Sequence, residues 1–275
     1  MQSKITGGQT KLLFTAKVLS KYDVSYYRCT ETGFIQTEDP YWLEEAYSSA
    51  ITKLDIGLVL RNQNMATITE KLLYYNFDHN KKFLDYAGGY GLFTRIMRDK
   101  GYDFYNTDSY CQNIFAEFQD LSQLPVDTDF ELVTAFEVLE HLPQPMNTLE
   151  SLFDKYDNVL FSTELVPKEL QPIKDWWYFI FETGQHVALY TLEALEFIAN
   201  KFNRKLYSNG INIHLFCKKV LPENPFTATP HQDDFLIKKM RAKLQRYDRR
   251  NNLGGTPAKL SLMPKDMEEI KKRLL

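Results

Sequence analysis

The stretch from Lys82 to Gly91, with the sequence KFLDYAGGYG, constrains this chain more than any other part of it. A short apolar strand runs into an acidic residue and a glycine-rich turn, and residues 92–100 have the pattern of an amphipathic helix. A strand ending at such a turn leaves a crevice at its carboxyl end, where N–H groups of the next helix are exposed. A strand–turn–helix corner without a ligand has the same local pattern, so the residues that follow must decide.

Acidic residues end the strands that follow the turn. The second strand ends at Asp108, about twenty residues beyond the turn, where a carboxylate can accept the hydroxyls of a ribose. The third ends at Asp120 and Leu121, where an acid can meet an adenine amino group, and the fourth is an apolar strand ending at Phe136 and Glu137. These positions predict a site for a nucleoside-containing cofactor.

Strand and helix patterns alternate from Lys82 onward, which is typical of a mostly parallel sheet with helices on both faces. We expect strands at residues 82–87, 103–107, 115–119, 130–136, 158–164, 204–208 and 211–219. We expect helices at residues 91–100, 145–155 and 191–203. Only Asn209 and Gly210 separate the last two strands, and this dipeptide predicts a hairpin with an antiparallel final strand.

Three regions flank or interrupt this pattern. Residues 1–80 are expected to form an N-terminal hairpin and helical cap, with a short helix at 11–19, a hairpin at 26–36 and mostly helix from residue 41. Residues 81–221 would form the cofactor-binding domain. Within it, residues 165–190 are too long for an ordinary loop and too aromatic for a linker, which predicts a lid or pocket wall.

The last region, residues 222–275, is expected to be a C-terminal helical tail with a basic run at residues 238–250. A solvated helix face explains such a run most simply, and binding to phosphate groups or to another subunit is the alternative.

Composition narrows the class of protein. The net charge of −3 does not favour nucleic acid or an acidic membrane as a partner, and no apolar run reaches the ~18 residues of a membrane span. The three cysteines are widely spaced without a CxxC pair, which indicates reduced thiols and no structural zinc site. The first ten residues are polar and lack the apolar core of a signal peptide. We therefore expect a cytoplasmic protein.

Residues 84–91 and 136–145 carry a family resemblance. Over roughly residues 80–220 the chain is similar to class I S-adenosylmethionine-dependent methyltransferases, in the group sharing LDxGxGxG and FExLEHLPxP. Weaker likenesses in residues 41–62 and 175–186 are to methyltransferases of bacterial glycan and secondary-metabolite gene sets. The resemblance implies an α/β fold with a seven-stranded Rossmann-like sheet, an antiparallel last strand and a small-molecule or sugar acceptor.

The resemblance also implies which residues contact S-adenosylmethionine. They are Asp85, Ala87, Gly88, Gly89, Tyr90, Gly91, Asp108, Asp120, Leu121, Phe136 and Glu137. Ala87 replaces the first glycine of the family turn, and alanine is costly there if the backbone has a positive φ.

Candidate acceptor-site residues follow the fourth strand and lie in the aromatic lid. We predict His141 and His186 as catalytic residues that take a proton or orient the acceptor. The alternative for each is a histidine that only hydrogen-bonds a loop or packs in the core. Predicted acceptor-binding residues are Arg61, Trp176, Trp177 and Tyr178.

Two rival functions stay open, and a third is disfavoured. Glu137, Glu140 and His141 match an E-x-x-E-H pattern that binds magnesium in some quinone O-methyltransferases, although we assign no metal ligand. A cofactor-binding but catalytically idle subunit would also suit Ala87. A dehydrogenase is disfavoured because G-x-G-x-x-G is absent and Tyr90 would crowd a pyrophosphate. The sequence leaves a homo-oligomer open.

Overall fold

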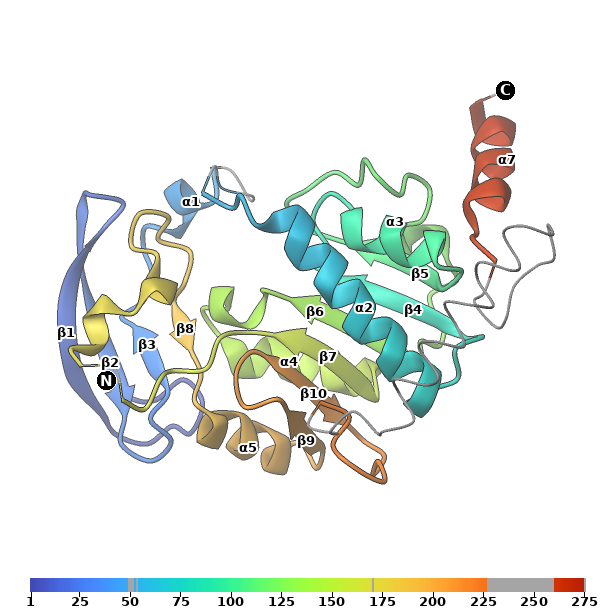
Figure 1. Cartoon of the computed structure of the whole chain (residues 1–275). Helices are drawn as coiled ribbons and strands as arrows, with labels where there is room; N and C mark the ends of the chain where they lie inside the picture. The colour runs from blue at the N-terminus through green and yellow to red at the C-terminus, as the bar shows by residue number, and fades with distance from the viewer. Residues whose placement is uncertain (49–51, 53, 170, 227–259, 275) are drawn as a thin grey trace.

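The computed structural model describes residues 1–48, 52, 54–169, 171–226 and 260–274. Two β-sheets lie side by side in it, and Figure 1 shows the smaller one beside the larger one with its layer of helices. The smaller sheet has the strand order β1-β2-β3-β8, and the larger has the order β5-β4-β6-β7-β10-β9.

The larger sheet matches the predicted mixed topology. Its strands are β4 (Lys82–Tyr86), β5 (Asp103–Thr107), β6 (Leu132–Phe136), β7 (Asn158–Ser162), β9 (Lys205–Ser208) and β10 (Ile213–Cys217). The first four run parallel, and β10 is antiparallel to both β7 and β9. The predicted antiparallel hairpin is therefore present, with Gly210 at a φ of 75°, but its loop spans residues 209–212 rather than the two residues predicted.

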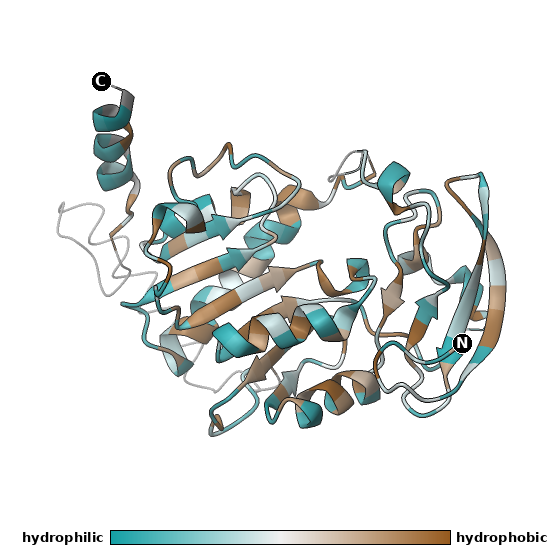
Figure 2. Cartoon of the chain, turned by 180° about the vertical axis from the view of Figure 1, so that it is seen from behind, coloured by the Kyte–Doolittle hydropathy of each residue, from teal (hydrophilic) through white to brown (hydrophobic). Residues whose placement is uncertain are grey.

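Helices cover both faces of this sheet, as expected from the alternating pattern. One face packs against α2 (Leu58–Asn76) and α3 (Leu92–Asp99). The other packs against α4 (Pro145–Lys155) and α5 (Leu192–Lys201). Figure 2 shows the hydrophobic colour concentrated on the central strands and the hydrophilic colour on the outer helix faces. Packing on both faces of the sheet thus holds the carboxyl end of β4 in place, and the glycine turn begins there.

Among the described residues the larger sheet has six strands rather than the predicted seven, because residues 115–119 form no strand. Only the adjoining Asp120 makes an isolated bridge, with Asn106. The side chain of Asn113 holds a turn instead, because its Oδ1 accepts from the N–H of Ala116 and its Nδ2 donates to the Ala116 carbonyl. Phe118 has a φ of 64°, which no extended strand adopts. Local hydrogen bonding therefore replaces the sheet ladder at this edge.

The N-terminal helix predicted at residues 11–19 is also wrong, because Thr10–Val18 forms strand β1. It pairs with β2 (Tyr22–Cys29), which pairs with β3 (Ile35–Thr37). Leu19 and Ser20 have φ values of 53° and 57°, the positive pair of a type I′ turn, and the N–H of Lys21 closes this turn by donating to the carbonyl of Val18 at 3.0 Å. Neither leucine nor serine is among the glycine, asparagine and aspartate residues that usually supply positive φ in such turns, so the sequence hid this hairpin.

The aromatic insertion completes the smaller sheet. Its strand β8 (Ala188–Leu189) pairs with β3, and the N–H of Leu19 donates to the carbonyl of Phe181 at 2.9 Å. Val18, Tyr26, Trp42 and Phe179 share one buried cluster with the rest of the insertion. The insertion thus packs on the N-terminal region, next to the short helix α1 (Leu43–Ala46). The domain boundaries at 80 and 221 stay a prediction.

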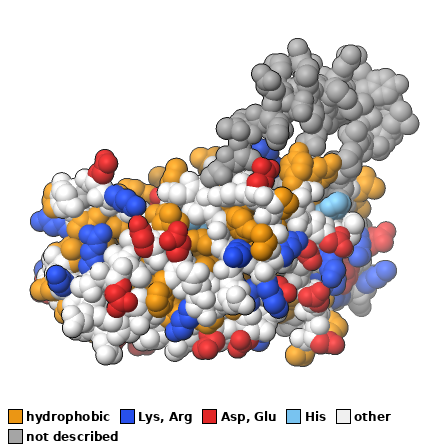
Figure 3. Space-filling view, turned by 90° about the horizontal axis from the view of Figure 1, so that it is seen from below, with side chains coloured by type: hydrophobic (Ala, Val, Ile, Leu, Met, Phe, Trp, Pro, Cys, Tyr) orange, Lys and Arg blue, Asp and Glu red, His pale blue; other side chains and the backbone are white. Residues whose placement is uncertain are grey.

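The last described element is α7 (Met263–Leu274). The predicted basic run at 238–250 lies outside the described residues. Among the helices that the structure describes, none has both the length and the apolar character needed to cross a bilayer. Figure 3 shows acidic and basic side chains interspersed on the face seen from below.

Candidate active site

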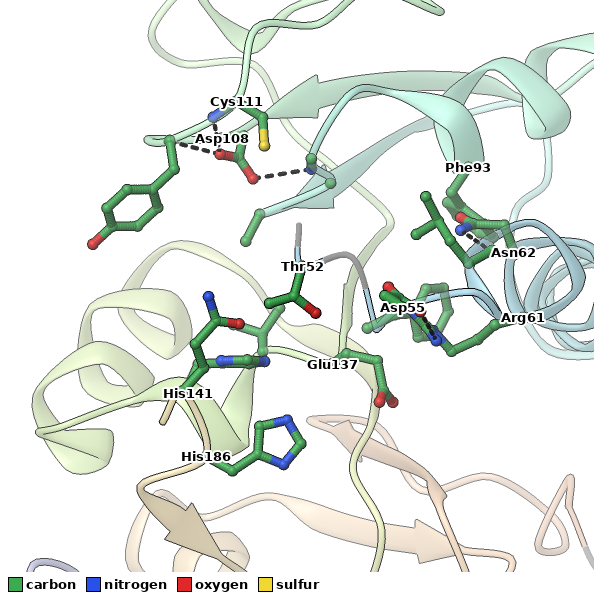
Figure 4. Close-up of a pocket in the computed structure, with 18 of the residues that line it drawn as sticks. Thr52, Asp55, Arg61, Asn62, Phe93, Asp108, Cys111, Glu137, His141 and His186 are labelled. Carbon is green, nitrogen blue, oxygen red and sulfur yellow. Dashed lines mark hydrogen bonds and ion pairs between the residues drawn. The ribbon is translucent and has the colours of Figure 1, made fainter. Parts of the chain in front are cut away.

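A cavity of about 1060 Å³ opens at the carboxyl ends of β4, β5 and β6. Its lining runs from the glycine turn, through Asp108 and Phe136, to Trp177 and His186 in the aromatic insertion. Figure 4 shows Asp108 on one side of this cavity and Glu137, His141 and His186 on the other, with Arg61 at its flank. The cavity is therefore one continuous space between the predicted cofactor residues and the predicted acceptor residues.

The glycine turn is tightly packed and partly left-handed. Ala87 has a φ of 54°, the conformation in which alanine is costly, and Gly89 and Gly91 have φ values of 57° and 81°. At Gly88, a Cβ atom would lie 2.1 Å from Asn106 Oδ1 and 2.3 Å from Asp85 Oδ2. The turn can thus bring its backbone close to a ligand, but it leaves no room for larger residues.

Asp85 lies beneath this turn, 2% exposed. Thr134 Oγ1 donates to its Oδ1 at 2.8 Å and Thr94 Oγ1 to its Oδ2 at 3.4 Å. Burial raises the pKa of Asp85 to about 7, although the two hydroxyls partly offset this effect. The side chain supports the floor of the cavity and adds a titratable group near neutral pH.

Asp108 fastens the turn to the neighbouring strand. Its Oδ2 accepts from the N–H of Gly89 at 2.9 Å, and its Oδ1 accepts from the N–H groups of Tyr110 and Cys111, each at 2.7 Å. These bonds use three of the roughly four acceptor positions of a carboxylate. Asp108 lines the cavity as predicted, and its geometry shows a positioning role besides any contact to a ribose.

Asp120 and Leu121 do not reach the cavity lining among the described residues. Asn113 Nδ2 donates to Asp120 Oδ1 at 2.9 Å, and Leu121 packs against the apolar core. Residues 108–111 and Phe115 line this part of the cavity instead. The sequence placed these two residues at the end of a strand that the structure lacks.

Two carboxylates, those of Glu137 and Glu140, lie close together in the segment that follows β6. Ser162 Oγ donates to Glu137 Oε1 at 2.6 Å, and the hydroxyl of Tyr178 lies 2.6 Å from Glu140 Oε1 and 3.4 Å from Glu137 Oε2. Burial raises the pKa of both, and the pKa of Glu140 reaches about 8 because the charge of Glu137 adds to its complete burial. Glu137 is thus held with a φ of 53° at the cavity wall.

The two predicted catalytic histidines lie together, with ring centroids 4.9 Å apart. Nδ1 of His186 lies 2.6 Å from the carbonyl oxygen of Tyr178, and Nδ1 of His141 lies 3.0 Å from the hydroxyl of Tyr47. Burial lowers the pKa of both, to about 4 for His186. Since a carbonyl only accepts, Nδ1 of His186 carries the proton and its Nε2 is an acceptor at neutral pH.

The predicted acceptor-binding residues divide between wall and core. Trp177 is 65% exposed and lines the cavity together with Tyr178, whereas Trp176 is buried in the cluster of the smaller sheet. Arg61 lines the cavity, but both of its terminal nitrogens donate to Asp55, at 2.9 and 2.7 Å. Arg61 is therefore already neutralised by a local partner.

Sequence reasoning missed Tyr47, Asp55 and Ser162. Tyr47 contacts His141 and stacks on Tyr110 at 5.0 Å, and Ser162 bonds both the N–H and the carboxylate of Glu137. A tyrosine in a helical pattern and a serine ending a buried strand carry no signal of their own. The partners of Tyr47 and Ser162 lie far away in the sequence, whereas Asp55 pairs with the nearby Arg61.

The sheet order with β10 reversed, and a glycine turn opening onto a cavity at the carboxyl edge, define a class I methyltransferase fold. A family model described as a methyltransferase domain matches residues 60–209. The chain belongs to this methyltransferase-domain family, whose cofactor is S-adenosylmethionine. No curated protein matches the chain.

Solved structures show a distant likeness. An O-methyltransferase family 2 protein from Planctomyces limnophilus, in complex with apigenin, is 16% identical, with a TM-score of 0.42 over 64% of this chain and 65% of that one. An O-methyltransferase family protein from Burkholderia thailandensis is 9% identical, with a TM-score of 0.44 over 66% and 64%. The chain thus spans less than two thirds of either protein, and the assignment rests on the family match.

Proposed function

We propose that this protein transfers a methyl group from S-adenosylmethionine to an oxygen or nitrogen of a small-molecule or sugar acceptor. The observation that carries the proposal is the continuous cavity of about 1060 Å³ between the glycine turn and His186. Small-molecule sites typically measure about 300–1,000 Å³, so this one can hold a cofactor and a small acceptor together.

The two ends of the cavity suit the two reactants. The adenosyl group would lie against the glycine turn and Asp108, whose carboxylate keeps about one acceptor position free beside its three backbone bonds. The acceptor would then occupy the end lined by His141, Trp177 and His186. In this arrangement the transferred methyl group lies near Glu137, between the two ends.

The reaction would be an in-line displacement at the methyl carbon of the sulfonium. Because the sulfonium is already activated, alignment and exclusion of water are the main tasks, and positioning can supply about 7–11 kcal/mol. His186 is a neutral ring with an unprotonated Nε2, which can accept the proton of an acceptor group or orient it. The rings of Tyr90, Trp177 and Tyr178 line the cavity and can stabilise the positive sulfonium.

Two measurements test this function. Calorimetry should show that one S-adenosylmethionine binds per chain, and isotope-labelled cofactor should deliver its methyl group to at least one member of a panel of phenols, sugars and amines. Absence of cofactor binding would overturn the proposal. Binding without transfer to any acceptor would favour the catalytically idle cofactor-binding protein.

We predict that His186→Ala lowers the methyl-transfer rate by about 10²–10⁴-fold, the range for a lost proton-transfer group, and leaves cofactor affinity nearly unchanged. His186 lies at the acceptor end, away from the glycine turn, which explains the separation of the two effects. His79→Ala is the matched control, because that ring stacks on Tyr74 outside the cavity lining. A wild-type rate in His186→Ala would leave the ring with a packing role only.

A further inference from the structure

Three potential metal ligands gather at the acceptor end of the cavity. One carboxylate oxygen of Glu140 and one ring nitrogen each of His141 and His186 all lie within 4.8 Å of one another. The two histidines belong to segments 45 residues apart, since His141 follows β6 and His186 precedes β8. Figure 4 shows both rings pointing into the same part of the cavity. This group differs from the predicted E-x-x-E-H set, because His186 takes the place of Glu137.

Glu140 supplies an independent observation. Its side chain is completely buried, and its Oε2 has no hydrogen-bond partner among the described residues. Its Oε1 accepts from the hydroxyl of Tyr178 at 2.6 Å. A buried polar atom without a partner is unfavourable by about 1–3 kcal/mol and needs an explanation. A cation bound beside this carboxylate would satisfy it.

The histidines are held as metal ligands usually are. Nδ1 of His186 donates to the carbonyl of Tyr178 at 2.6 Å, which directs the lone pair of Nε2 away from that carbonyl. A second ring nitrogen bonded to a backbone carbonyl is the common arrangement around bound metals. The hydroxyl of Tyr47 fixes the ring of His141 at 3.0 Å from its Nδ1.

We propose that Glu140, His141 and His186 bind a divalent first-row transition cation, such as Mn²⁺, Fe²⁺, Co²⁺ or Zn²⁺. Two imidazoles and one carboxylate suit these ions, whereas Mg²⁺ prefers oxygen ligands and retained water. Ligand atoms about 2.1 Å from one ion lie at most about 4.2 Å apart. The observed spread of up to 4.8 Å needs only a small inward rotation of the side chains.

This site deepens the proposed function and rests on it. Three protein ligands leave coordination positions free, and His141 and His186 line the cavity where the acceptor would bind. With the cation bound, the lone pair of His186 Nε2 is used for coordination, so His186 would no longer take the proton itself. An acceptor hydroxyl bound to the cation would instead lose its proton to solvent more readily. Its oxygen would then attack the methyl carbon, so that a C–O bond forms while the C–S bond breaks and its electron pair stays on sulfur. The products are a methyl ether and S-adenosylhomocysteine, so the site assigns oxygen as the methylated atom.

The test measures Co²⁺ binding to chelator-treated wild-type protein, by calorimetry and by the visible absorption of bound Co²⁺. We expect one saturable site, with a visible absorption band characteristic of Co²⁺ coordinated by imidazole nitrogen. Glu140→Gln and His186→Gln keep the approximate size of the side chains. Because each changes a direct ligand, it should weaken Co²⁺ binding by at least the roughly 10–100-fold that loss of a residue hydrogen-bonded to a ligand costs. His79→Gln, outside the cluster, should bind Co²⁺ within twofold of the wild type.

No saturable Co²⁺ site in the wild type would overturn the proposal, as would unchanged affinity in both Glu140→Gln and His186→Gln. Mg²⁺ that displaces Co²⁺ at equal concentration would overturn the assigned class of cation. Calorimetry with S-adenosylmethionine on the metal-free protein separates the two proposals. Cofactor binding without Co²⁺ binding would remove the metal site and leave the proposed function. Co²⁺ binding without cofactor binding would remove the proposed function and the role of the cation in methyl transfer, and leave only the metal site.

Discussion

At the scale of the residue, the rim of the cavity holds unusual backbone conformations. Ala87 and Glu137, which follow β4 and β6, have φ values of 54° and 53°. Such left-handed residues are disfavoured by roughly 1–2 kcal/mol and persist where the surrounding fold enforces them. Both lie in the cavity lining, so the strain is located where the cofactor and acceptor would meet.

We predict that Ala87→Gly raises the free energy of unfolding by about 0.5–1 kcal/mol, because glycine accepts the left-handed conformation without its penalty. Gly88→Ala should instead lower the free energy of unfolding, since its Cβ would lie 2.1 Å from Asn106 and 2.3 Å from Asp85. Urea unfolding of both variants checks this. A destabilised Ala87→Gly would show that the methyl group of Ala87 contributes packing that outweighs its backbone strain.

We predict that Asp108→Asn weakens S-adenosylmethionine binding by at least about tenfold, equivalent to about 1.4 kcal/mol. The amide keeps the shape of the side chain but loses one acceptor oxygen, and so loses bonds to Gly89 or to Tyr110 and Cys111. Asp120→Asn is the control, because Asp120 does not line the cavity. Calorimetry with both variants measures the difference, and equal affinities would exclude Asp108 from the cofactor site.

At the scale of the element, α7 is tied to α3 by a buried ion pair. Arg98 is 2% exposed and donates from Nε and Nη2 to the two oxygens of Asp266, at 2.9 and 2.8 Å. Arg95 also donates to Asp266. The remaining guanidinium nitrogen of Arg98 bonds Asp103 and the Phe104 carbonyl, so α7 completes a network that begins inside the sheet.

We predict that Asp266→Ala lowers the free energy of unfolding by about 2–4 kcal/mol, because it leaves the guanidinium of Arg98 buried with a partner missing. Glu269→Ala, on the same helix, removes a partly exposed pair with Arg273 and should change stability by less than about 1 kcal/mol. Urea unfolding compares the two variants. Equal small effects would mean that α7 contributes little to the stability of the domain.

At the scale of the whole molecule, the α1 segment and the aromatic insertion line one end of the cavity of the larger sheet, and both pack against the smaller sheet. Trp42 Nε1 donates to the carbonyl of Gly184 at 2.9 Å, and Gln185 Nε2 donates to the carbonyl of Ala46 at 2.8 Å. Segments about 140 residues apart in the chain are thereby joined. The acceptor end consequently depends on the complete fold, whereas the glycine turn depends on the larger sheet.

The buried carboxylate Asp85 should make the stability of the whole fold depend on pH. Its pKa is about 7 in the folded protein against 3.8 ordinarily, so between these values the folded state binds more protons than the unfolded state. The free energy of unfolding therefore receives a contribution from Asp85 that falls as pH rises from about 4 to about 7.

We predict that Asp85→Asn gains stability over the wild type through this pH range, by at most about 4 kcal/mol at pH 8. The amide oxygen can still accept from Thr134, so the packing is preserved. Urea unfolding at several pH values measures the difference between the two proteins, which isolates Asp85 from the other buried acids. Parallel pH profiles would show that Asp85 is not titrating in this range.

The local patterns in the sequence predicted most of the larger sheet. The apolar strand before Asp85, the glycine turn and the Asn209-Gly210 hairpin all carry their signals within a few residues, and each is present. The β1–β2 hairpin was missed because Leu19 and Ser20 adopt left-handed turn conformations supported by contact with Phe181. The prediction of a strand at residues 115–119 was wrong because the side chain of Asn113 hydrogen-bonds the backbone N–H and carbonyl of Ala116. The periodicity of apolar residues does not reveal such a bond.

The amino-acid sequence alone determined the class of fold and the place of the glycine turn, because strand periodicity and turn chemistry act between near neighbours. The grouping of Glu140, His141 and His186, and the division of Trp176 from Trp177, emerged only when distant segments packed together. Burial and hydrogen bonding between segments far apart in the chain decide which polar groups meet, and a one-dimensional pattern does not contain those contacts.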